Sequence, residues 1–459
     1  MSIGGILLKL WILAEERPKV EVIKQILTKI SEDFSYDLKV DKIYIKPVFI
    51  KNHFSFEYIV EGAHIPEFSQ IIIRIVSGGS SFVDFLIYFS DNEPFSSQEP
   101  VYAIEETKTS DKESRNTGIY QRSSKFVYVN LYYPNCKKIM LYNLRMKDNV
   151  KPTDTNIFGS RLLKTIGVEI IGKIQEEDIF PRFKNIEEII EYKSKMRKAP
   201  KGNVPITINK YENKILISGR LYKSGSLSHD PNIGALSLIS QTLRNLGWDK
   251  EIIITNHGLS NSNLGVKNKF IQIANELNMA LDGLKMPKTI LPKDYWHFES
   301  NSEKIVSIFL HLLLDQLDNY KVIYENHAGC ERGYFYTNEG IPITVHKYIK
   351  NKKNNGIIYL PDLIVKDVLN KTIYNLEAKI YERRMDGIKE INNFSSIEEE
   401  YIKYYYPNYK IIRGVVIYGG TTSVAIDKIY VQINRLGEIF ISDNAPSIFN
   451  KEIKNIIPV

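Results

Sequence analysis

Asp362, Glu377 and Lys379 are the residues whose types and spacing most clearly suggest chemistry. The apolar segment that carries Glu377 and Lys379 predicts a β-strand, and residues two positions apart on a strand point to the same face. A second predicted strand contains Asp362, and a tight polar turn joins the two strands. Pairing of these strands would bring Asp362 beside Glu377. We therefore expect two carboxylates and one ammonium group at the edge of a sheet.

These three side chains, the C-terminal triad, suit the hydrolysis of a phosphodiester. Asp362 and Glu377 would hold Mg²⁺, a hard cation that prefers oxygen ligands, and the carbonyl group of Ala378 could add another ligand. A bound metal polarises the phosphate and lowers the pKa of a coordinated water. Lys379 would position or deprotonate that water and offset the negative charge of the transition state. Glu303, at the start of a predicted helix, is a candidate for an additional acid.

An ordinary Glu–Lys pair on a solvated strand face is the alternative for the C-terminal triad. Acid-x-lysine triplets are common in charged proteins, so the triplet is informative only through its surroundings. Three features favour catalysis: the predicted hairpin, Pro361 directly before the acid, and a strongly amphipathic predicted helix at 302–318.

Asp84, Glu106 and Lys108 form a second set, the N-terminal triad. Asp84 stands in the apolar run 82–89, where a charge is costly unless it is paired or binds a metal. Glu106 and Lys108 share one face of the next predicted strand, with Glu106 and Asp84 as metal ligands. Glu105 is on the other face and is expected to be structural. The alternative is a degenerate site that survives as scaffold.

The segment after Lys108 is dense in side chains that form hydrogen bonds. Arg, Asn, Gln, Ser and Lys are the residues that contact base edges and phosphates. A loop that begins beside a catalytic lysine could read a groove or hold a phosphate, although a polar surface loop would have the same composition. The candidate DNA-binding residues are Ser110, Lys112, Arg115, Asn116, Gln121 and Arg122.

The C-terminal triad, with Pro361 in front of its aspartate, resembles the motif of the PD-(D/E)XK nuclease superfamily, and within it type II restriction endonucleases. The N-terminal triad resembles the same motif without the proline. This resemblance implies an α/β fold with a mixed β-sheet core flanked by helices, dependence on Mg²⁺, and double-stranded DNA as the partner. It covers the two outer thirds of the chain.

The chain is expected to contain three consecutive regions. Residues 1–150 and 296–459 each read as a nuclease domain, and residues 151–295 read as a middle α/β region for bridging or DNA recognition. The tetrapeptide Tyr-Tyr-Pro-Asn occurs at 132–135 and again at 405–408, each time between a predicted helix and a predicted strand. The shared order of hairpin, helix, tetrapeptide and strand indicates a duplicated unit. Convergence of local chemistry at a helix end is the alternative.

The composition limits which partners, compartments and membrane associations fit the sequence. The formal net charge of +7 is compatible with a polyanionic partner but is not diagnostic of one. Two cysteines are too few for a disulfide framework or a zinc site, which favours a reducing compartment. No window approaches the roughly 18 apolar residues of a membrane-spanning helix, and the N-terminus lacks a signal-peptide layout. We expect a cytoplasmic monomer or homodimer that does not enter a membrane.

The expected function is that of a type II restriction endonuclease, which makes Mg²⁺-dependent double-strand cuts at a specific sequence with one active site for each strand. A cognate DNA methyltransferase encoded nearby would be its partner. A DNA repair or junction-resolving nuclease would prefer branched DNA instead. A DNA-binding protein with degenerate nuclease folds would show no metal-dependent turnover. A structural interaction protein is the remaining alternative.

Overall fold

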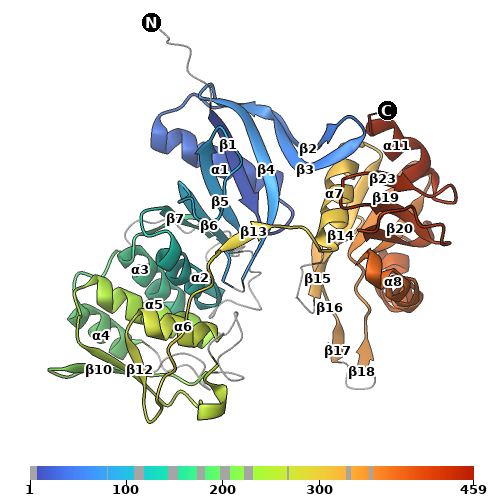
Figure 1. The fold of residues 1–459 in the computed structure, drawn as a ribbon. Coiled ribbons are helices and arrows are strands. Elements are labelled where there is room, and N and C mark those ends of the chain that lie inside the picture. The colour runs from blue at the N-terminus through green and yellow to red at the C-terminus, as the bar shows by residue number, and fades with distance from the viewer. Residues whose placement is uncertain are drawn as a thin grey trace, which may run out of the picture. The chain divides into compact units, whose positions relative to one another are not determined.

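The computed structural model has a mixed α/β fold, as the sequence predicted, with several mixed sheets (Figure 1). The residues it describes are 8–79, 81–107, 118–142, 153–172, 181–196, 207–221, 231–265, 268–326, 332–350 and 355–458. The chain divides into two compact units. Unit 1 consists of Met1–Lys9, Glu16–Ile75 and Phe298–Val459, and unit 2 consists of Leu10–Glu15 and Val76–His297.

This grouping differs from the three consecutive regions expected from the sequence. Residues 16–75 belong with the C-terminal region, and residues 151–295 belong with residues 76–150. Aromatic packing explains the first difference, because the ring of Phe309 lies 6.2 Å from that of Phe49 and 4.8 Å from that of Phe54. Such long-range packing between rings is not visible in local sequence patterns.

The N-terminal part of unit 1 is a helix followed by a long β-ribbon. Helix α1 (Val20–Phe34) forms here because its apolar residues recur at helical spacing, and these residues are buried. Strands β2 (Lys39–Ile50) and β3 (His53–His64) pair in antiparallel fashion, and β3 pairs with β4 (Phe68–Gly78). The apolar runs with β-branched residues at 43–50 and 70–76 lie within β2 and β4.

The C-terminal part of unit 1 is an eight-stranded sheet of order β16-β15-β14-β19-β20-β21-β22-β23. Its strands are β14 (Tyr320–Asn326), β15 (Arg332–Tyr336), β16 (Pro342–His346), β19 (Leu363–Asp367), β20 (Thr372–Ile380), β21 (Lys410–Tyr418), β22 (Ile429–Ile433) and β23 (Ile439–Ile441). A separate ribbon joins β17 (Tyr348–Lys350) to β18 (Asn355–Ile357). The hairpin of β19 and β20 is antiparallel, whereas β20, β21 and β22 are parallel.

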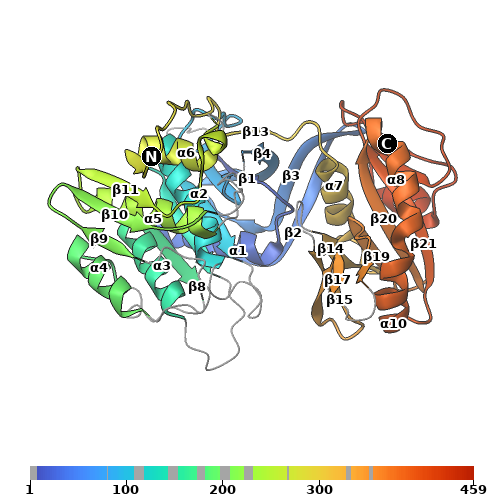
Figure 2. The same ribbon diagram turned by 90° about the horizontal axis from the view of Figure 1, so that it is seen from below.

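A helical segment crosses from β20 to the parallel strand β21 and covers one face of this sheet (Figure 2). It contains α8 (Arg384–Glu390), α9 (Ser395–Ile397) and α10 (Lys403–Tyr405), which are linked by a 3-10 turn and a π-helical turn. Its residues Ile391, Phe394 and Ile397 pack into the core with Ile373 and Val415. Helix α7 (Lys304–Leu314) contacts β14, β20 and β21, and the C-terminal segment ends in α11 (Lys454–Ile456).

The main sheet of unit 2 has the order β1-β5-β6-β7-β8. Its strands are β1 (Leu8–Ala14), β5 (Phe85–Ser90), β6 (Tyr102–Thr107), β7 (Lys137–Tyr142) and β8 (Val168–Gly172). Strands β5 and β6 are antiparallel, and β6, β7 and β8 are parallel. Helix α2 (Gly118–Tyr132) connects β6 to β7, and α3 (Asp154–Thr165) precedes β8.

A smaller sheet of order β12-β11-β10-β9 completes unit 2. It contains β9 (Ile208–Lys210), β10 (Lys214–Ser218), β11 (Glu251–Thr255) and β12 (Met279–Leu281), with helices α4 (Ile186–Lys195), α5 (Pro231–Asn245) and α6 (Lys269–Glu276) and the short strand β13 (Trp296–Phe298) after it. Helix α5 packs closely on α2, since a Cβ atom on Gly234 would lie only 1.6 Å from the carbonyl oxygen of Tyr120. Only glycine allows this approach of the two backbones.

Both units contain the same order of elements around the repeated tetrapeptide. An antiparallel hairpin (β5–β6 or β19–β20) is followed by a helical segment, the Tyr-Tyr-Pro-Asn sequence and a parallel strand. The parallel strand begins at Lys137 after Pro134 in unit 2, and at Lys410 after Pro407 in unit 1.

Candidate functional site

The hairpin of β19 and β20 brings Asp362 beside Glu377, as the sequence predicted. Leu363 pairs with Leu376, so the next residues of the ladder, Asp362 and Glu377, lie opposite each other and share a face. Asp362 is held in place by two hydrogen bonds to β20: its N–H donates to the carbonyl of Leu376 at 3.2 Å, and its Oδ2 accepts from the N–H of Ala378 at 2.8 Å.

Lys379 lies on the same face of β20 as Glu377 and connects two acids. Its Nζ donates a hydrogen bond to Oε1 of Glu377 and lies 2.9 Å from Oε2 of Glu390, at the end of α8. Lys379 and Glu377 are both buried, whereas the Glu390 side chain is 36% exposed. The ammonium group is therefore held between one inner and one outer carboxylate. Arg383 lies 4.0 Å from Glu390 on the solvent side.

Helix α8 packs directly on the aliphatic stem of Lys379. A Cβ atom added to Gly387 would lie 3.0 Å from Cγ of Lys379 and 3.0 Å from Cγ1 of Val415. Glycine at this position therefore lets the helix approach the strand, and this approach fixes the path of the Lys379 side chain. Sequence reasoning did not single out Gly387, because its role depends on helix–sheet packing.

Several acids lie close together in this site with little access to solvent, and this raises the pKa values of Asp362 and Glu377. Burial raises the pKa of Asp362 to about 6, and Glu303 and Glu390 add to the rise. Burial, then the nearby Asp362, raise the pKa of Glu377 strongly. The assignment of Glu303 as an additional acid stays a prediction. A bound cation would relieve the repulsion among these acids.

The donor set fits Mg²⁺ by its chemistry. Asp362 and Glu377 offer carboxylate oxygens on one strand face, and Mg²⁺ commonly uses one or two carboxylates together with water and substrate phosphates. Among the described residues, no group of three or more His, Cys, Asp and Glu side chains is arranged to hold a metal ion. A metal ion held by Asp362 and Glu377 would therefore need water and substrate as its remaining ligands.

An ion pair between the half-buried Arg413 and the buried Glu398 anchors the helical segment on the same face of β20. Arg413 donates to both carboxylate oxygens of Glu398, at 2.7 and 2.6 Å, and Asn375 donates to Glu398 at 3.1 Å. Such a bidentate pair is geometrically specific. Because Asn375 precedes Glu377 by two residues, this anchor continues the row of polar side chains that includes Glu377 and Lys379. It comes from three separate elements, and no sequence motif signals it.

Tyr324 on β14 is a further residue that sequence reasoning missed. It is fully buried, and its hydroxyl group makes no hydrogen bond to the described residues. Burial raises its pKa, and the nearby carboxylates of Asp362 and Glu377 raise it further. A protonated hydroxyl group therefore lies within the electrostatic reach of both acids.

Unit 2 brings Asp84 together with Glu105 rather than with Glu106. Phe85 pairs with Ile104, so the next residues of the ladder, Asp84 and Glu105, lie opposite each other, just as Asp362 lies opposite Glu377. Strand β5 begins at Phe85, one residue after Asp84, not at Phe82 as predicted. Asp84 Oδ2 accepts a hydrogen bond from the N–H of Glu106 at 2.7 Å, which matches the bond between Asp362 and Ala378.

The expectation that Glu106 faces Asp84 and that Glu105 is only structural therefore needs correction. Successive residues of a strand point to opposite faces, so Glu106 points away from the face shared by Asp84 and Glu105. The sequence prediction assigned residues to strand faces by counting alternate positions back from Lys108. The long polar connection between the two strands hides their register, and a shift of one residue reverses every face.

Helix α2 supplies two cations to Glu105. Arg122 donates to Glu105 at 2.9 Å and Lys125 donates to it at 3.0 Å, while the N–H of Asp84 lies 3.1 Å from the same carboxylate. Lys125 also lies 3.9 Å from Oδ1 of Asp84. Burial, then Asp84, raise the pKa of Glu105 to about 7 although Lys125 and Arg122 lower it. Two acids, a lysine and an arginine thus form one cluster.

Several predicted residues lie outside the described residues. They are Lys108, Ser110, Lys112, Arg115 and Asn116, and the side chain of Gln121 is likewise outside the description although its backbone belongs to α2. Arg122 is described, and it is directed to Glu105 on the inner side of α2. Its predicted contact with DNA stays a prediction.

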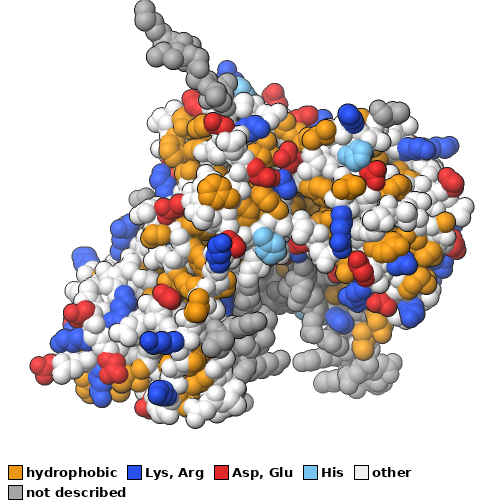
Figure 3. All heavy atoms as spheres, in the orientation of Figure 1, with side chains coloured by type: hydrophobic (Ala, Val, Ile, Leu, Met, Phe, Trp, Pro, Cys, Tyr) orange, Lys and Arg blue, Asp and Glu red, His pale blue; other side chains and the backbone are white. Residues whose placement is uncertain are grey.

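Charges of both signs are mixed on one face of the protein. On the face shown in Figure 3, Lys and Arg side chains are interspersed with Asp and Glu side chains. No helix within the described ranges is long and apolar enough to cross a membrane. Comparison with known proteins found no matching family model, no matching curated protein and no matching solved structure.

Proposed function

We propose that this protein is a metal-dependent DNA endonuclease with Asp362, Glu377 and Lys379 in its active site. The observation that carries this proposal is the placement of Asp362 directly opposite Glu377 on paired strands, with Lys379 on the same face. A half-buried aspartate and a buried glutamate whose pKa values are raised, next to a lysine, are typical of a site that binds a cation or performs proton transfer.

Each residue has a distinct role in this proposal. Asp362 and Glu377 would hold Mg²⁺, which supplies Lewis-acid activation of the phosphate when it is bound. Lys379 would orient the attacking water and offset the charge that develops on the phosphate oxygens. Glu390 also contacts Lys379 and would hold the ammonium group if Glu377 served as a metal ligand.

The cluster of Asp84 and Glu105 is proposed as the second active site. Lys125, from α2, would take the role that the sequence suggested for Lys108, since its ammonium group lies near both acids. The shared order of elements around the two clusters supports the duplication of one nuclease unit with a restriction-endonuclease-like fold. Each site would then cut one strand of a duplex.

A type II restriction endonuclease is the form of nuclease that we propose. Two sites in one chain would allow cleavage of both strands without a two-fold symmetric recognition sequence. The part of unit 2 between residues 151 and 295 would contribute to DNA recognition, in a cytoplasmic protein accompanied by a cognate DNA methyltransferase. A junction-resolving nuclease and a DNA-binding protein with inactive nuclease folds are the competing proposals.

Digestion of supercoiled plasmid and phage DNA tests this proposal. With Mg²⁺ we expect discrete fragments, and with EDTA we expect none. Fragments from a branched junction together with intact plasmid would favour the junction-resolving alternative. Absence of cleavage of every substrate with Mg²⁺ or Mn²⁺, while the protein retains binding to DNA, would favour the inactive binding protein.

A further inference from the structure

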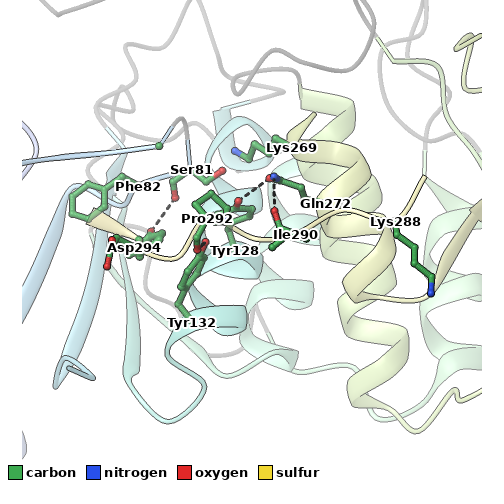
Figure 4. Close-up of a pocket in the computed structure, with 12 residues that line it drawn as sticks. Ser81, Phe82, Tyr128, Tyr132, Lys269, Gln272, Lys288, Ile290, Pro292 and Asp294 are labelled. Atoms are coloured by element: carbon green, nitrogen blue, oxygen red, sulfur yellow. Dashed lines mark hydrogen bonds between the residues drawn. The ribbon is translucent and has the colours of Figure 1, made fainter. Parts of the chain in front are cut away.

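Unit 2 contains a cavity of about 640 Å³ beside the cluster of Asp84 and Glu105. This volume is within the range of about 300–1,000 Å³ that is usual for ligand pockets. The residues around it come from four separate parts of unit 2: the segment before β5, helix α2, helix α6, and the segment that follows β12 (Figure 4).

Aromatic rings form one wall of this cavity. The ring of Tyr295 lies 5.2 Å from that of Phe82 and 5.1 Å from that of Tyr132, and the rings of Tyr128 and Tyr132 lie 5.6 Å apart. All four residues line the cavity. Aromatic side chains grouped in this way stack on flat heteroaromatic rings without requiring a particular base.

Hydrogen bonds hold this wall in place before any ligand arrives. The hydroxyl group of Tyr295 donates to the carbonyl of Ser81 at 2.9 Å and accepts from the N–H of Val83 at 3.1 Å. Tyr128 donates to Gln272 at 2.8 Å, and Tyr132 donates to the carbonyl of Pro292 at 2.7 Å. A wall that is already ordered reduces the entropic cost of binding.

A buried lysine adds a polar group to the cavity. Lys269 is only 5% exposed, and its Nζ donates to Ser124 at 3.2 Å. Figure 4 shows its amine end directed toward Ser81, whereas Lys288 points away from the rings. Burial lowers the pKa of Lys269 to about 7, and Lys125 lowers it further. Such an amine can donate a hydrogen bond to a base edge without the full desolvation penalty of a charged group.

The cavity is next to the second cluster of acids. Ser81 and Phe82 line the cavity and lead directly to Asp84 along the chain. Ser124, the partner of Lys269, precedes Lys125 on α2. The wall of the cavity and the cluster thus share both the start of β5 and helix α2.

We propose that this cavity binds a single nucleobase. The inference rests on the proposed nuclease function, because a strand that reaches Asp84 and Glu105 would bring its bases to this wall. A base supplied by DNA would have to leave the stack, which costs least where the base is unpaired. A free nucleotide would present the same ring to the same wall.

Binding of 2-aminopurine, a fluorescent base analogue, tests this proposal in EDTA with the full-length chain. The probes are the free deoxynucleoside monophosphate and a short duplex with one 2-aminopurine opposite an abasic position. Wild type should bind at least one probe, with a change in its fluorescence. Binding of the duplex but not of the monophosphate identifies DNA as the source of the base, and the reverse result identifies a free nucleotide.

Variants of Tyr132 locate the binding. Tyr132→Ala should weaken binding by about tenfold, because one stacked base contributes ~1–3 kcal/mol, whereas Tyr132→Phe retains the ring and should bind nearly as wild type does. Tyr211→Ala removes a tyrosine that is exposed elsewhere in unit 2 and serves as the control. Equal affinities of wild type, Tyr132→Ala and Tyr211→Ala, or no binding of either probe, would overturn the proposal.

Failure of this inference can be told apart from failure of the proposed function. The binding assay contains no metal and records no cleavage. Cleavage of plasmid without any binding of 2-aminopurine would overturn the base-binding proposal and leave the nuclease proposal intact. Binding of 2-aminopurine that depends on Tyr132, without cleavage of any DNA, would support the base-binding proposal and overturn the nuclease proposal.

Discussion

Asp362 accepts a hydrogen bond from the backbone N–H of Ala378 at 2.8 Å, so that its carboxylate is fixed between Glu377 and Lys379 along the strand. The same relationship joins Asp84 to the N–H of Glu106 at 2.7 Å in the other unit. In both places an aspartate at the start of one strand is held by the backbone of its neighbour. Each is thereby positioned opposite a glutamate.

Replacement of Asp362 by Asn separates charge from structure. The Asn side-chain oxygen can still accept the hydrogen bond of Ala378, and loss of one negative charge relieves repulsion with Glu377. We expect the melting temperature to change little and the strand cut made by the C-terminal site to fall at least ~100-fold, so that nicked plasmid accumulates, because a metal ligand is lost. Asp386→Asn, on the exposed side of α8, is the matched control. Full activity of Asp362→Asn would contradict the assigned role.

Replacement of Gly387 by Ala tests the support of Lys379. The new methyl group would lie 3.0 Å from Cγ of Lys379, so either the helix or the lysine must shift. We expect the strand cut made by the C-terminal site to fall about tenfold, while the gain in helix propensity of up to ~1 kcal/mol offsets part of the strain in stability. Gly265→Ala, where a Cβ would meet no atom within 4 Å, should leave activity unchanged. Equal activities of both variants would exclude a role for this contact.

Neutral substitutions of Glu105 and Glu106 test the corrected assignment in unit 2. Glu105 lies with Asp84 and Lys125, whereas Glu106 points to the other face, so only Glu105→Gln should abolish one of the two strand cuts. The measurement is the proportion of nicked to linear plasmid. The opposite result, loss of a strand cut in Glu106→Gln alone, would show that Glu106 is the acid that acts with Asp84, as the sequence first suggested.

The pH dependence of stability provides an independent check on Glu105. Because the pKa of Glu105 in the folded protein is raised to about 7, the folded state binds a proton more tightly than the unfolded state. Glu105 therefore destabilises the fold as pH rises from its usual pKa range through about 7. Denaturant unfolding in EDTA should show wild type losing stability relative to Glu105→Gln across this window. A constant difference between the two proteins would contradict the raised pKa.

The sequence allowed part of this fold to be predicted because some signals are local. The apolar periodicity of α1 and the continuous apolar runs of β11 and β21 each coincide with the observed element. Asp362 and Glu377 could be paired because a short turn joins their strands, which leaves little freedom in the register.

The features of the fold and of the sites that could not be predicted depend on long-range packing. The connection between β5 and β6 is long and polar, so the alternation that places Asp84 opposite Glu105 could not be counted. Lys125 reaches these acids from a helix, and Tyr324 and Gly387 reach the C-terminal site through sheet order and helix packing. The association of residues 16–75 with the C-terminal region also rests on ring contacts that no local pattern encodes.

The most direct test of the nuclease proposal is a plasmid digest with Mg²⁺ that compares wild type, Lys379→Ala, Lys125→Ala and the double variant. Lys403→Ala, which removes an exposed lysine from the same helical segment, is the control. We predict linear DNA from wild type and the control, open circles from each single variant, and no cleavage by the double variant. Linear DNA from the double variant at the wild-type rate would contradict the assignment of both sites.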